Sequence, residues 1–124
     1  MNLVDSSGWL EYFADGRNAG FFAPAIENAK ALLVSPINVY EVFKRIAQQR
    51  DENAAMQAIA VMQEGTMVPL SDDLAVVAAG IALELKLPMT DSLILATARL
   101  NRATVWTQDA DFERLNGVKY VAKR

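Results

Sequence analysis

The 124-residue sequence contains neither cysteine nor histidine. The absence of cysteine excludes disulfides, thiolate metal sites and cysteine nucleophiles. The absence of histidine excludes Ser-His-Asp catalysis, imidazole metal ligands and histidine acid–base chemistry. Any catalysis at neutral pH must therefore use carboxylates, hydroxyls, lysine, arginine or a bound ion, and a bound metal would be a hard cation held by oxygen.

Long apolar runs and an excess of basic charge are also missing. The longest uncharged, mostly apolar run covers only residues 74–83, about half of the roughly 20 residues that a membrane-spanning helix needs. The start of the chain, MNLVDSSGWL, lacks the basic and apolar regions of a signal peptide. The net charge of −3, from 12 basic and 15 acidic residues, argues weakly against binding nucleic acid through bulk charge. We therefore expect a cytoplasmic globular protein without membrane contact.

What is present is enough apolar material for an ordinary core. Hydrophobic residues make up 52% of the chain, and a chain of this length buries roughly two-thirds of its unfolded surface on folding. No repeat, low-complexity segment or linker interrupts the sequence. We therefore expect one domain over residues 1–124.

Short apolar segments alternate with helical patterns along the whole chain. The segments that read as strands are Leu3–Val4, Ala31–Val34, Thr66–Leu70, Thr104–Trp106 and Val118–Val121. The helical patterns cover Ser7–Phe13, Gly20–Lys30, Pro36–Gln49 after a Ser35 cap, Asp51–Glu64, a helix capped by Ser71 that runs to Leu85, one capped by Thr90 that runs to Asn101, and Ala110–Leu115. Most of the strands are apolar on both faces, which is typical of a parallel sheet covered on both sides by helices. The predicted fold class is therefore α/β.

Acidic residues fall where such sheets bind ligands, outside the carboxyl ends of strands and at the helix starts that follow. Asp5 ends the first strand, Asp109 follows the strand at Thr104–Trp106, and Asp111 lies two residues further on. Asp91 opens a helix, and Glu41 lies within the helix that follows the second strand.

Each of these acids also has a local structural explanation. Asp5 could simply cap the first helix, and Asp91 could be a first-turn acid favoured by the helix dipole. Glu41 could pair with Lys44 or Arg45 on the same helix, an interaction worth a few tenths of a kcal/mol. The two acids after the Thr104–Trp106 strand stand in a turn, where aspartate is common for local reasons.

Convergence of these acids at one sheet edge would favour a different interpretation. Carboxylates packed together repel one another, and one of them is driven to its protonated form unless a cation lies among them. Mg²⁺ or Mn²⁺ binds such oxygen ligands. A bound ion of this kind polarises a phosphoryl oxygen and generates hydroxide for in-line attack, which is chemistry available to a protein without histidine or cysteine.

Four sequence segments resemble those of a known family. They are LVDSSGWLEYF, SPINVYEVFKR, LPMTDSLILATA and TVWTQDADFERL, and they occur in the family's order over essentially the whole chain. On these segments the sequence resembles a PIN domain, specifically a VapC-type toxin of a bacterial or archaeal toxin–antitoxin pair. The resemblance implies a three-layer α/β/α sandwich with a central, mainly parallel sheet of about five short strands.

The resemblance also implies an activity, that of a Mg²⁺- or Mn²⁺-dependent ribonuclease. Carried over by motif, Asp5, Asp91 and Asp109 would hold the metal. Glu41 would complete the acidic cluster, as a ligand or through water.

Three further residues match positions beside those acids. Ser6 and Thr107 correspond to hydroxyl residues that accompany the acids and would orient them. Some relatives place their last acid at the position of Asp111, which would then share or replace the role of Asp109.

The partners that the resemblance implies are an RNA substrate, a second copy of the chain in a homodimer, and a cognate antitoxin. The antitoxin would block the groove, often with a basic side chain directed into the acids. The aromatic group Tyr12, Phe13, Phe21 and Phe22 would offer a groove for an amphipathic helix, or would simply form core between helices. RNA contacts would fall to scattered basic residues, namely Arg17, Lys44, Arg45 and Arg102.

Other α/β classes fit the sequence less well. A receiver-like signalling module needs paired acids after the first strand, but Asp5 is followed by Ser6 and Ser7. A phosphatase with an aspartate nucleophile needs a second aspartate at the position of Ser7. A non-catalytic module that binds RNA or protein remains an alternative, although the presence of all four acids argues against it.

Overall fold

The computed structural model describes residues 1–124 and contains a five-stranded sheet in which every pairing is parallel. The strands are β1 (Asn2–Val4), β2 (Leu32–Val34), β3 (Thr66–Met67), β4 (Thr104–Thr107) and β5 (Val118–Tyr120). Their spatial order is β3-β2-β1-β4-β5, so β1 and β4 are neighbours although they are far apart in the sequence. The chain therefore reverses its direction of strand addition beside β1, which is where α/β sheets form ligand sites.

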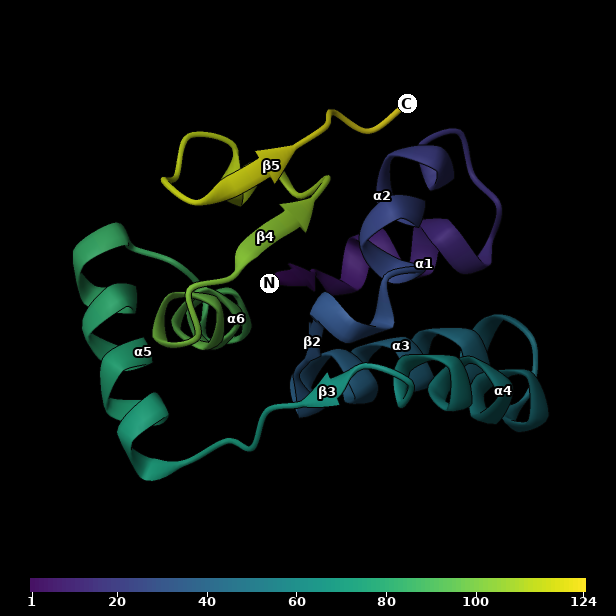
Figure 1. Cartoon of the computed structure of the whole chain (residues 1–124), viewed down its shortest axis with the longest axis horizontal. Coiled ribbons are helices and arrows are strands. Elements are labelled where there is room, and N and C mark those ends of the chain that lie inside the picture. Colours follow the sequence, from purple (N-terminus) through teal and green to yellow (C-terminus); the bar gives the residue numbers. More distant parts are fainter.

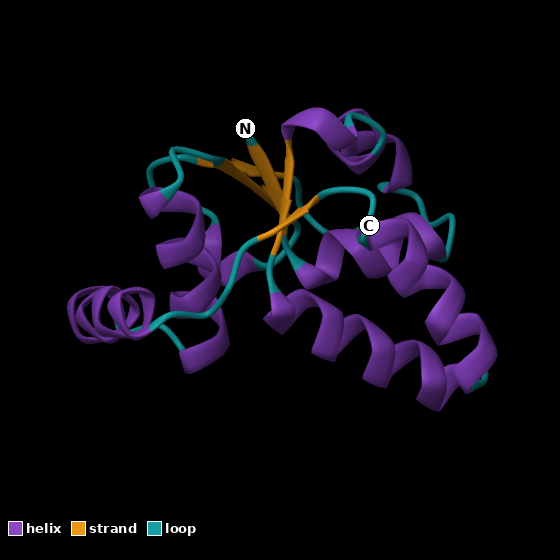
Figure 2. Cartoon of the chain, turned by 60° about the horizontal axis from the view of Figure 1, so that its bottom comes forward, coloured by secondary structure: helices purple, strands orange, loops and turns teal.

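Eight helical segments surround this sheet. The α-helices are α1 (Ser6–Phe13), α2 (Ala19–Ile26), α3 (Pro36–Gln49), α4 (Glu52–Met62), α5 (Asp72–Leu85) and α6 (Met89–Leu100), and the 3-10 helices are η1 (Ala29–Ala31) and η2 (Ala110–Phe112). Helices α1 to α4 lie on one side of the sheet and α5 and α6 on the other (Figure 1), and the turned view shows helices on both sides of the strands (Figure 2). The three-layer α/β/α sandwich expected from the sequence is confirmed. None of the helices has the length and apolar character needed to traverse a lipid bilayer.

Two hydrophobic cores, one on each face of the sheet, explain why the strands are apolar throughout. Successive strand residues point to opposite faces, so Leu3 joins the core under α5 and α6 while Val4 joins the core under α1 to α4. In the next strand Leu33 packs with Leu3, whereas its neighbour Val34 packs with Val4. Burial on both faces is what a parallel sheet between two helical layers requires.

Gly8 lets α1 pack closely against the sheet. A Cβ atom at this position would lie 2.5 Å from Cε1 of Phe22 and 2.7 Å from Cγ1 of Val4. Both neighbours are fully buried. The absence of a side chain at Gly8 therefore fixes how near the start of α1 comes to the end of β1.

Some element bounds differ from those expected. The helix expected over 20–30 ends at Ile26, and a separate 3-10 turn covers Ala29–Ala31, because the backbone of Asn28 leaves the helical region (φ −105°, ψ 72°). The strand expected over 66–70 is only two residues long. Pro69 lies two residues after the end of this strand and has no N–H to donate to a neighbouring strand.

The helix that carries Asp91 also begins earlier than expected. Pro88 occupies the N-cap position and Thr90 lies inside the helix rather than capping it. Proline has a fixed φ that suits the start of a helix, and its carbonyl accepts the N–H of Ser92 at 3.0 Å. Near the chain's end, the helix expected over 110–115 is a 3-10 turn over Ala110–Phe112.

Candidate active site

Asp5 lies in a cradle of hydrogen-bond donors at the end of β1. It is the N-cap of α1, and its Oδ1 accepts the backbone N–H of Ser6 at 2.8 Å. Its Oδ2 accepts the hydroxyls of Ser7 and Thr107, each at 2.9 Å. The carboxyl is only 6% exposed. Asp5 therefore both caps the helix and presents a fixed carboxylate at the sheet edge.

Burial is the main reason that the pKa of Asp5 is raised above its usual value. The hydrogen bonds from Thr107, Ser7 and Ser6 act in the opposite direction, and the charge of Asp109 adds to the increase. Burial of a carboxylate disfavours its charged form, while donors and nearby cations favour it. A cation at this edge would therefore lower the pKa of Asp5, as the three hydrogen-bond donors do.

Glu41 is held through a chain of buried polar side chains. Ser6 Oγ donates to Glu41 Oε1 at 2.7 Å, and Asn38 Nδ2 donates to Ser6 Oγ at 3.0 Å. Asn38 is fully buried, and its Oδ1 accepts the N–H of Ser35 at 3.2 Å. Glu41 is therefore hydrogen-bonded to Ser6 at the start of α1. A pairing with Lys44 on the same helix would not predict this contact.

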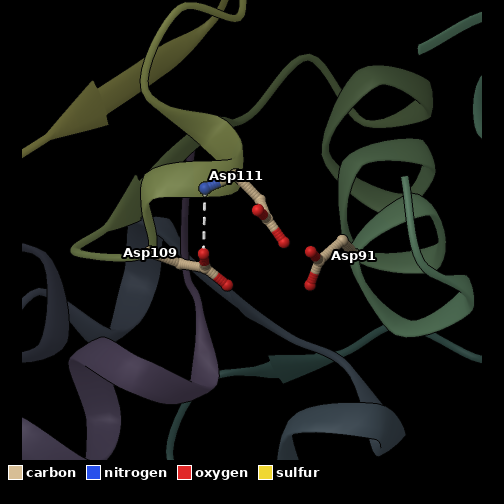
Figure 3. Close-up of side chains that lie close together, drawn as sticks. All are labelled: Asp91, Asp109 and Asp111. Carbon is tan, nitrogen blue, oxygen red and sulfur yellow. Dashed lines mark hydrogen bonds between the residues drawn. The ribbon is translucent and has the colours of Figure 1, made fainter. Parts of the chain in front are cut away.

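Three aspartates face one another across the end of β4 and the start of α6 (Figure 3). Carboxylate oxygens of Asp91, Asp109 and Asp111 all lie within 4.8 Å of one another. Asp109 caps the turn η2, where its Oδ1 accepts the N–H of Asp111 at 2.9 Å. Thr107 Oγ1 accepts the N–H of Asp109 at 2.9 Å and donates to Asp5, so it links the ends of β4 and β1.

Crowding of these carboxyls changes the ionisation of Asp91. The pKa of Asp91 is raised to about 8, first by burial and then by hydrogen bonding to Asp111 and by the charges of Asp109, Asp5 and Asp111. Near neutral pH this carboxyl therefore holds a proton. A divalent cation among the same oxygens would favour the charged form and so act against that protonation.

A pocket of about 440 Å³ is lined both by Asp5 and Glu41 and by two of the clustered aspartates. The residues that line it are Asp5, Ser6, Ser7, Leu10, Tyr40, Glu41, Lys44, Arg45, Gln48, Asp91 and Asp109. The structure therefore brings together the four acids expected from the sequence. Of the three expected supporting residues, Ser6 lines the pocket, Thr107 is buried behind it, and Asp111 belongs to the aspartate cluster without lining the pocket.

The donor set suits a hard divalent cation. All side chains in the cluster offer carboxylate oxygen, which is the ligand type that Mg²⁺ and Mn²⁺ favour in proteins. After burial and the hydrogen bond to Asp111, the charges of Asp109, Asp5 and Asp111 also contribute to the raised pKa of Asp91. Oxygens of Asp91, Asp109 and Asp111 lie within 4.8 Å of one another, and Asp5 lines the same pocket as Asp91 and Asp109.

Two site residues escaped the sequence interpretation. Ser7 donates to Asp5, and Asn38 orients the hydroxyl of Ser6. The sequence offered one indication for Asn38. It lies one helical turn before Glu41 and therefore on the same face of the helix.

A second pocket, of about 690 Å³, adjoins the first between α1, α3 and α4. Ser7, Leu10 and Arg45 line both pockets. Among the four aromatic residues expected to form a groove, only Phe13 lines this second pocket, and Phe22 is fully buried in the core. The groove is made by side chains of α1, α3 and α4 rather than by the four aromatic residues as a group.

The strand order and the acidic pocket at the ends of β1 and β4 occur together in a chain that matches a known family. A model of the PIN domain matches residues 3–118. The chain belongs to the PIN domain family. The resemblance drawn from the four sequence segments is therefore confirmed.

Solved structures of similar fold include chains from toxin–antitoxin complexes. The chain superposes on a protein of a toxin–antitoxin complex from Klebsiella pneumoniae with a TM-score of 0.80, at 25% identity and over 96% of both chains. It superposes on a sarcin–ricin loop cleaving VapC toxin of Mycobacterium tuberculosis with a TM-score of 0.78, at 17% identity, over 95% of this chain and 97% of that one. A chain of DNA-bound VapBC from Salmonella typhimurium gives 0.74, at 14% identity and over 98% of both chains. Among curated protein sequences, none matches this PIN domain.

Proposed function

We propose that this PIN domain is a metal-dependent endoribonuclease that acts as the toxin of a toxin–antitoxin pair. The observation that carries the proposal is the convergence of Asp5, Glu41, Asp91 and Asp109 on one pocket at the carboxyl edge of the sheet. The similarity in fold to VapC toxins, one of which is described as cleaving the sarcin–ricin loop, supports RNA as the substrate class.

In the proposed site Asp5, Asp91 and Asp109 would hold Mg²⁺ or Mn²⁺, and Asp111 would share the cluster on its outer side. Such an ion, when bound, would polarise a phosphoryl oxygen and lower the pKa of a water for in-line attack. Thr107 keeps Asp5 and Asp109 in a fixed relation, because its hydroxyl bonds to both.

The chain's own residues then orient the attacking water. Glu41 lines the pocket with Oε1 occupied by the Ser6 hydroxyl, so the carboxylate cannot swing away. We assign to Glu41 the role of accepting a hydrogen bond from that water and, as the phosphodiester is attacked, its proton. The fully buried Asn38 serves as a positioning residue for Ser6 and Glu41.

The antitoxin partner in this proposal binds the second pocket. Seven of the 15 residues that line that pocket are hydrophobic, among them Leu10, Ile46 and Val61, and the pocket adjoins the acidic pocket at Ser7 and Arg45. An amphipathic helix could bury its apolar face there. A basic side chain of that helix would then reach the acids and compete with the metal.

A homodimer and a cytoplasmic location complete the proposal. The helices α5 and α6 expose large apolar side chains, among them Val76, Leu83 and Met89, which is the kind of surface that a second copy would cover. Light scattering of the purified protein would measure its mass in solution, and a monomeric mass would contradict the dimer. Fractionation of cells that express the protein would test its location, and recovery outside the cytoplasmic fraction would contradict that part of the proposal.

The decisive experiment is cleavage of total cellular RNA by antitoxin-free protein with Mg²⁺, with Mn²⁺ and with EDTA. Cleavage should require metal and should be lost in Asp5→Asn and Asp91→Asn. The matched control is Asp73→Asn, which removes an exposed first-turn aspartate of α5 away from the pocket, and it should cleave as the wild type does. Folded wild-type protein that cleaves no RNA with either metal would overturn the proposal and favour a binding module.

A further inference from the structure

One wall of the acidic pocket differs in chemistry from the others. Tyr40, Lys44 and Gln48 lie one turn apart along α3, and all three line the acidic pocket, as does Arg45 beside Lys44. Tyr40 is 64% exposed. Side chains at this spacing share one face of a helix, so α3 presents an aromatic and basic strip directly beside Glu41.

Charge in the pocket is unevenly distributed. Asp5, Asp91 and Asp109 come from elements other than α3, whereas α3 supplies one acid, Glu41, and both cationic lining residues, Lys44 and Arg45. Lys44 Nζ lies 5.7 Å from the centroid of the Tyr40 ring. A phosphodiester strand that enters this pocket therefore finds its attractive charges on α3.

An exposed aromatic ring among cations is what single-stranded nucleic acid binds. Aromatic side chains stack on unpaired bases, and adjacent basic side chains hold the phosphates. We propose that Tyr40 stacks on an unpaired base of the RNA next to the scissile phosphate, and that Lys44 and Arg45 bind the flanking phosphates. This inference rests on the proposed nuclease function and names the part of the chain that holds its substrate.

The helix that carries Tyr40 is anchored at its start and on its opposite face, which limits how far a stacked base can lie from the acids. A capping box between Ser35 and Asn38 fixes the start of α3, and Val42 and Ile46 anchor its opposite face in the core. Tyr40 adjoins Glu41 in the chain, and Glu41 is itself tied to Ser6. A ring placed in this way can select for an unpaired nucleotide beside the cleavage point, which excludes continuous duplex.

The same geometry separates RNA from a protein partner. Tyr40, Lys44 and Gln48 line only the acidic pocket. The second pocket is lined mainly by residues of α1, α3 and α4, and Arg45 is the only residue that it shares with this wall. A partner helix bound in the second pocket would therefore leave the Tyr40 ring free. RNA is the occupant that matches the ring and the two cations together.

The test measures RNA binding in an Asp91→Asn background, which prevents cleavage, in the presence of Mg²⁺. The probe is a fluorescein-labelled single-stranded RNA dodecamer of mixed sequence, followed by fluorescence anisotropy, with its duplex as a second probe. Tyr40→Ala should weaken single-strand binding by about 5- to 100-fold, in line with the stacking energy of one base. Tyr40→Phe should bind as the parent does, because the ring is kept.

Two further readouts distinguish stacking from charge. A 2-aminopurine base in the RNA should be quenched by the parent protein but not by Tyr40→Ala. Lys44→Ala and Arg45→Ala should each reduce the slope of log K against log salt by about 0.7. The matched controls are Met56→Ala, which removes an exposed apolar side chain on α4, and Lys30→Ala, which removes an exposed lysine of η1; both should bind as the parent does.

Several results would overturn the inference. Tyr40→Ala that binds single-stranded RNA as tightly as Met56→Ala does would exclude stacking and leave this wall to a protein partner. If Tyr40→Ala loses equal affinity for single strand and duplex, the ring does not contact an unpaired base and the stacking role is wrong. If Tyr40→Ala, made without the Asp91 change, also cleaves RNA at the wild-type rate, the stacking role fails while the nuclease stands. Wild-type protein that neither binds nor cleaves RNA would overturn both.

Discussion

Replacing Asp91 with asparagine should stabilise the metal-free protein while abolishing cleavage. The pKa of Asp91 is raised from 3.8 to about 8 in the folded state, chiefly by burial and then by the neighbouring aspartates. In the unfolded chain the carboxyl has its ordinary pKa. Between these values the folded protein holds a proton that the unfolded chain has released, so the stability of the folded state falls as the pH rises from about 4 to about 8.

The size of the effect follows from the shift in pKa and from the exposure of the group. A shift of roughly four pKa units corresponds to an upper limit of about 6 kcal/mol. Asp91 is only half-buried, and solvent screening reduces that limit to about 2 kcal/mol. Asparagine has the same size without the charge. For a chain of this length Asp91→Asn should therefore raise the unfolding temperature by roughly 6–10 °C at the alkaline end of the range.

The assay is thermal unfolding followed by circular dichroism, in EDTA and in Mg²⁺. In EDTA the gain in unfolding temperature should be large near pH 8.5 and small near pH 5, about one unit above the ordinary pKa of aspartate. Added Mg²⁺ should stabilise the wild type and have little effect on the variant. Asp73→Asn serves as the control, since Asp73 is exposed and outside the pocket. A variant no more stable than the wild type at pH 8.5 would refute the reasoning.

Three other substitutions test the surroundings of the site. Glu41→Gln should reduce the rate of RNA cleavage by at least about 100-fold, as expected for loss of a general base, with the circular dichroism spectrum unchanged; wild-type activity would return Glu41 to the role of a solvated surface acid. Thr107→Val removes one donor from the buried carboxylate of Asp5 and should cost about 1–3 kcal/mol in urea unfolding and weaken Mg²⁺ binding in calorimetry; unchanged binding would contradict the link. Gly8→Ala forces a Cβ to within 2.5 Å of Phe22 and should cost about 1–3 kcal/mol; an unshifted urea midpoint would show that the neighbouring ring moves freely.

The sequence allowed the fold to be predicted wherever apolar pattern and local chemistry agree. Strands buried on both faces, such as the one that contains Leu3 and Val4, form continuous apolar runs and were found in place. The pattern failed where a backbone property outweighed it. Around β3 the apolar run continues to Leu70, yet the ladder stops because Pro69 has no N–H. The short turn η1 likewise follows from the backbone of Asn28 rather than from hydrophobicity.

At the site, the acids were predictable because carboxylates at strand ends have a limited set of roles. Their supporting residues were not. Asn38 lies in the first turn of a helix, where a polar side chain usually serves the helix alone; it does so here through Ser35, and it also holds Ser6. Ser6 was expected to support the acids, and it contacts two of them: its hydroxyl donates to Glu41 and its backbone N–H donates to Asp5. Such contacts join residues that are far apart in the chain, and only the folded arrangement of β1 and α3 reveals them.

Two of the acids, Asp5 and Asp109, begin helical turns with the same carboxyl groups that line the pocket. One oxygen of each accepts a backbone N–H, from Ser6 in one case and from Asp111 in the other. Asparagine keeps an oxygen that can accept this N–H, whereas alanine removes it. A change from aspartate to asparagine therefore removes the charge that the proposed reaction needs while keeping the helix caps. A lineage could lose the activity of this protein by one substitution and still keep a folded protein that binds its antitoxin.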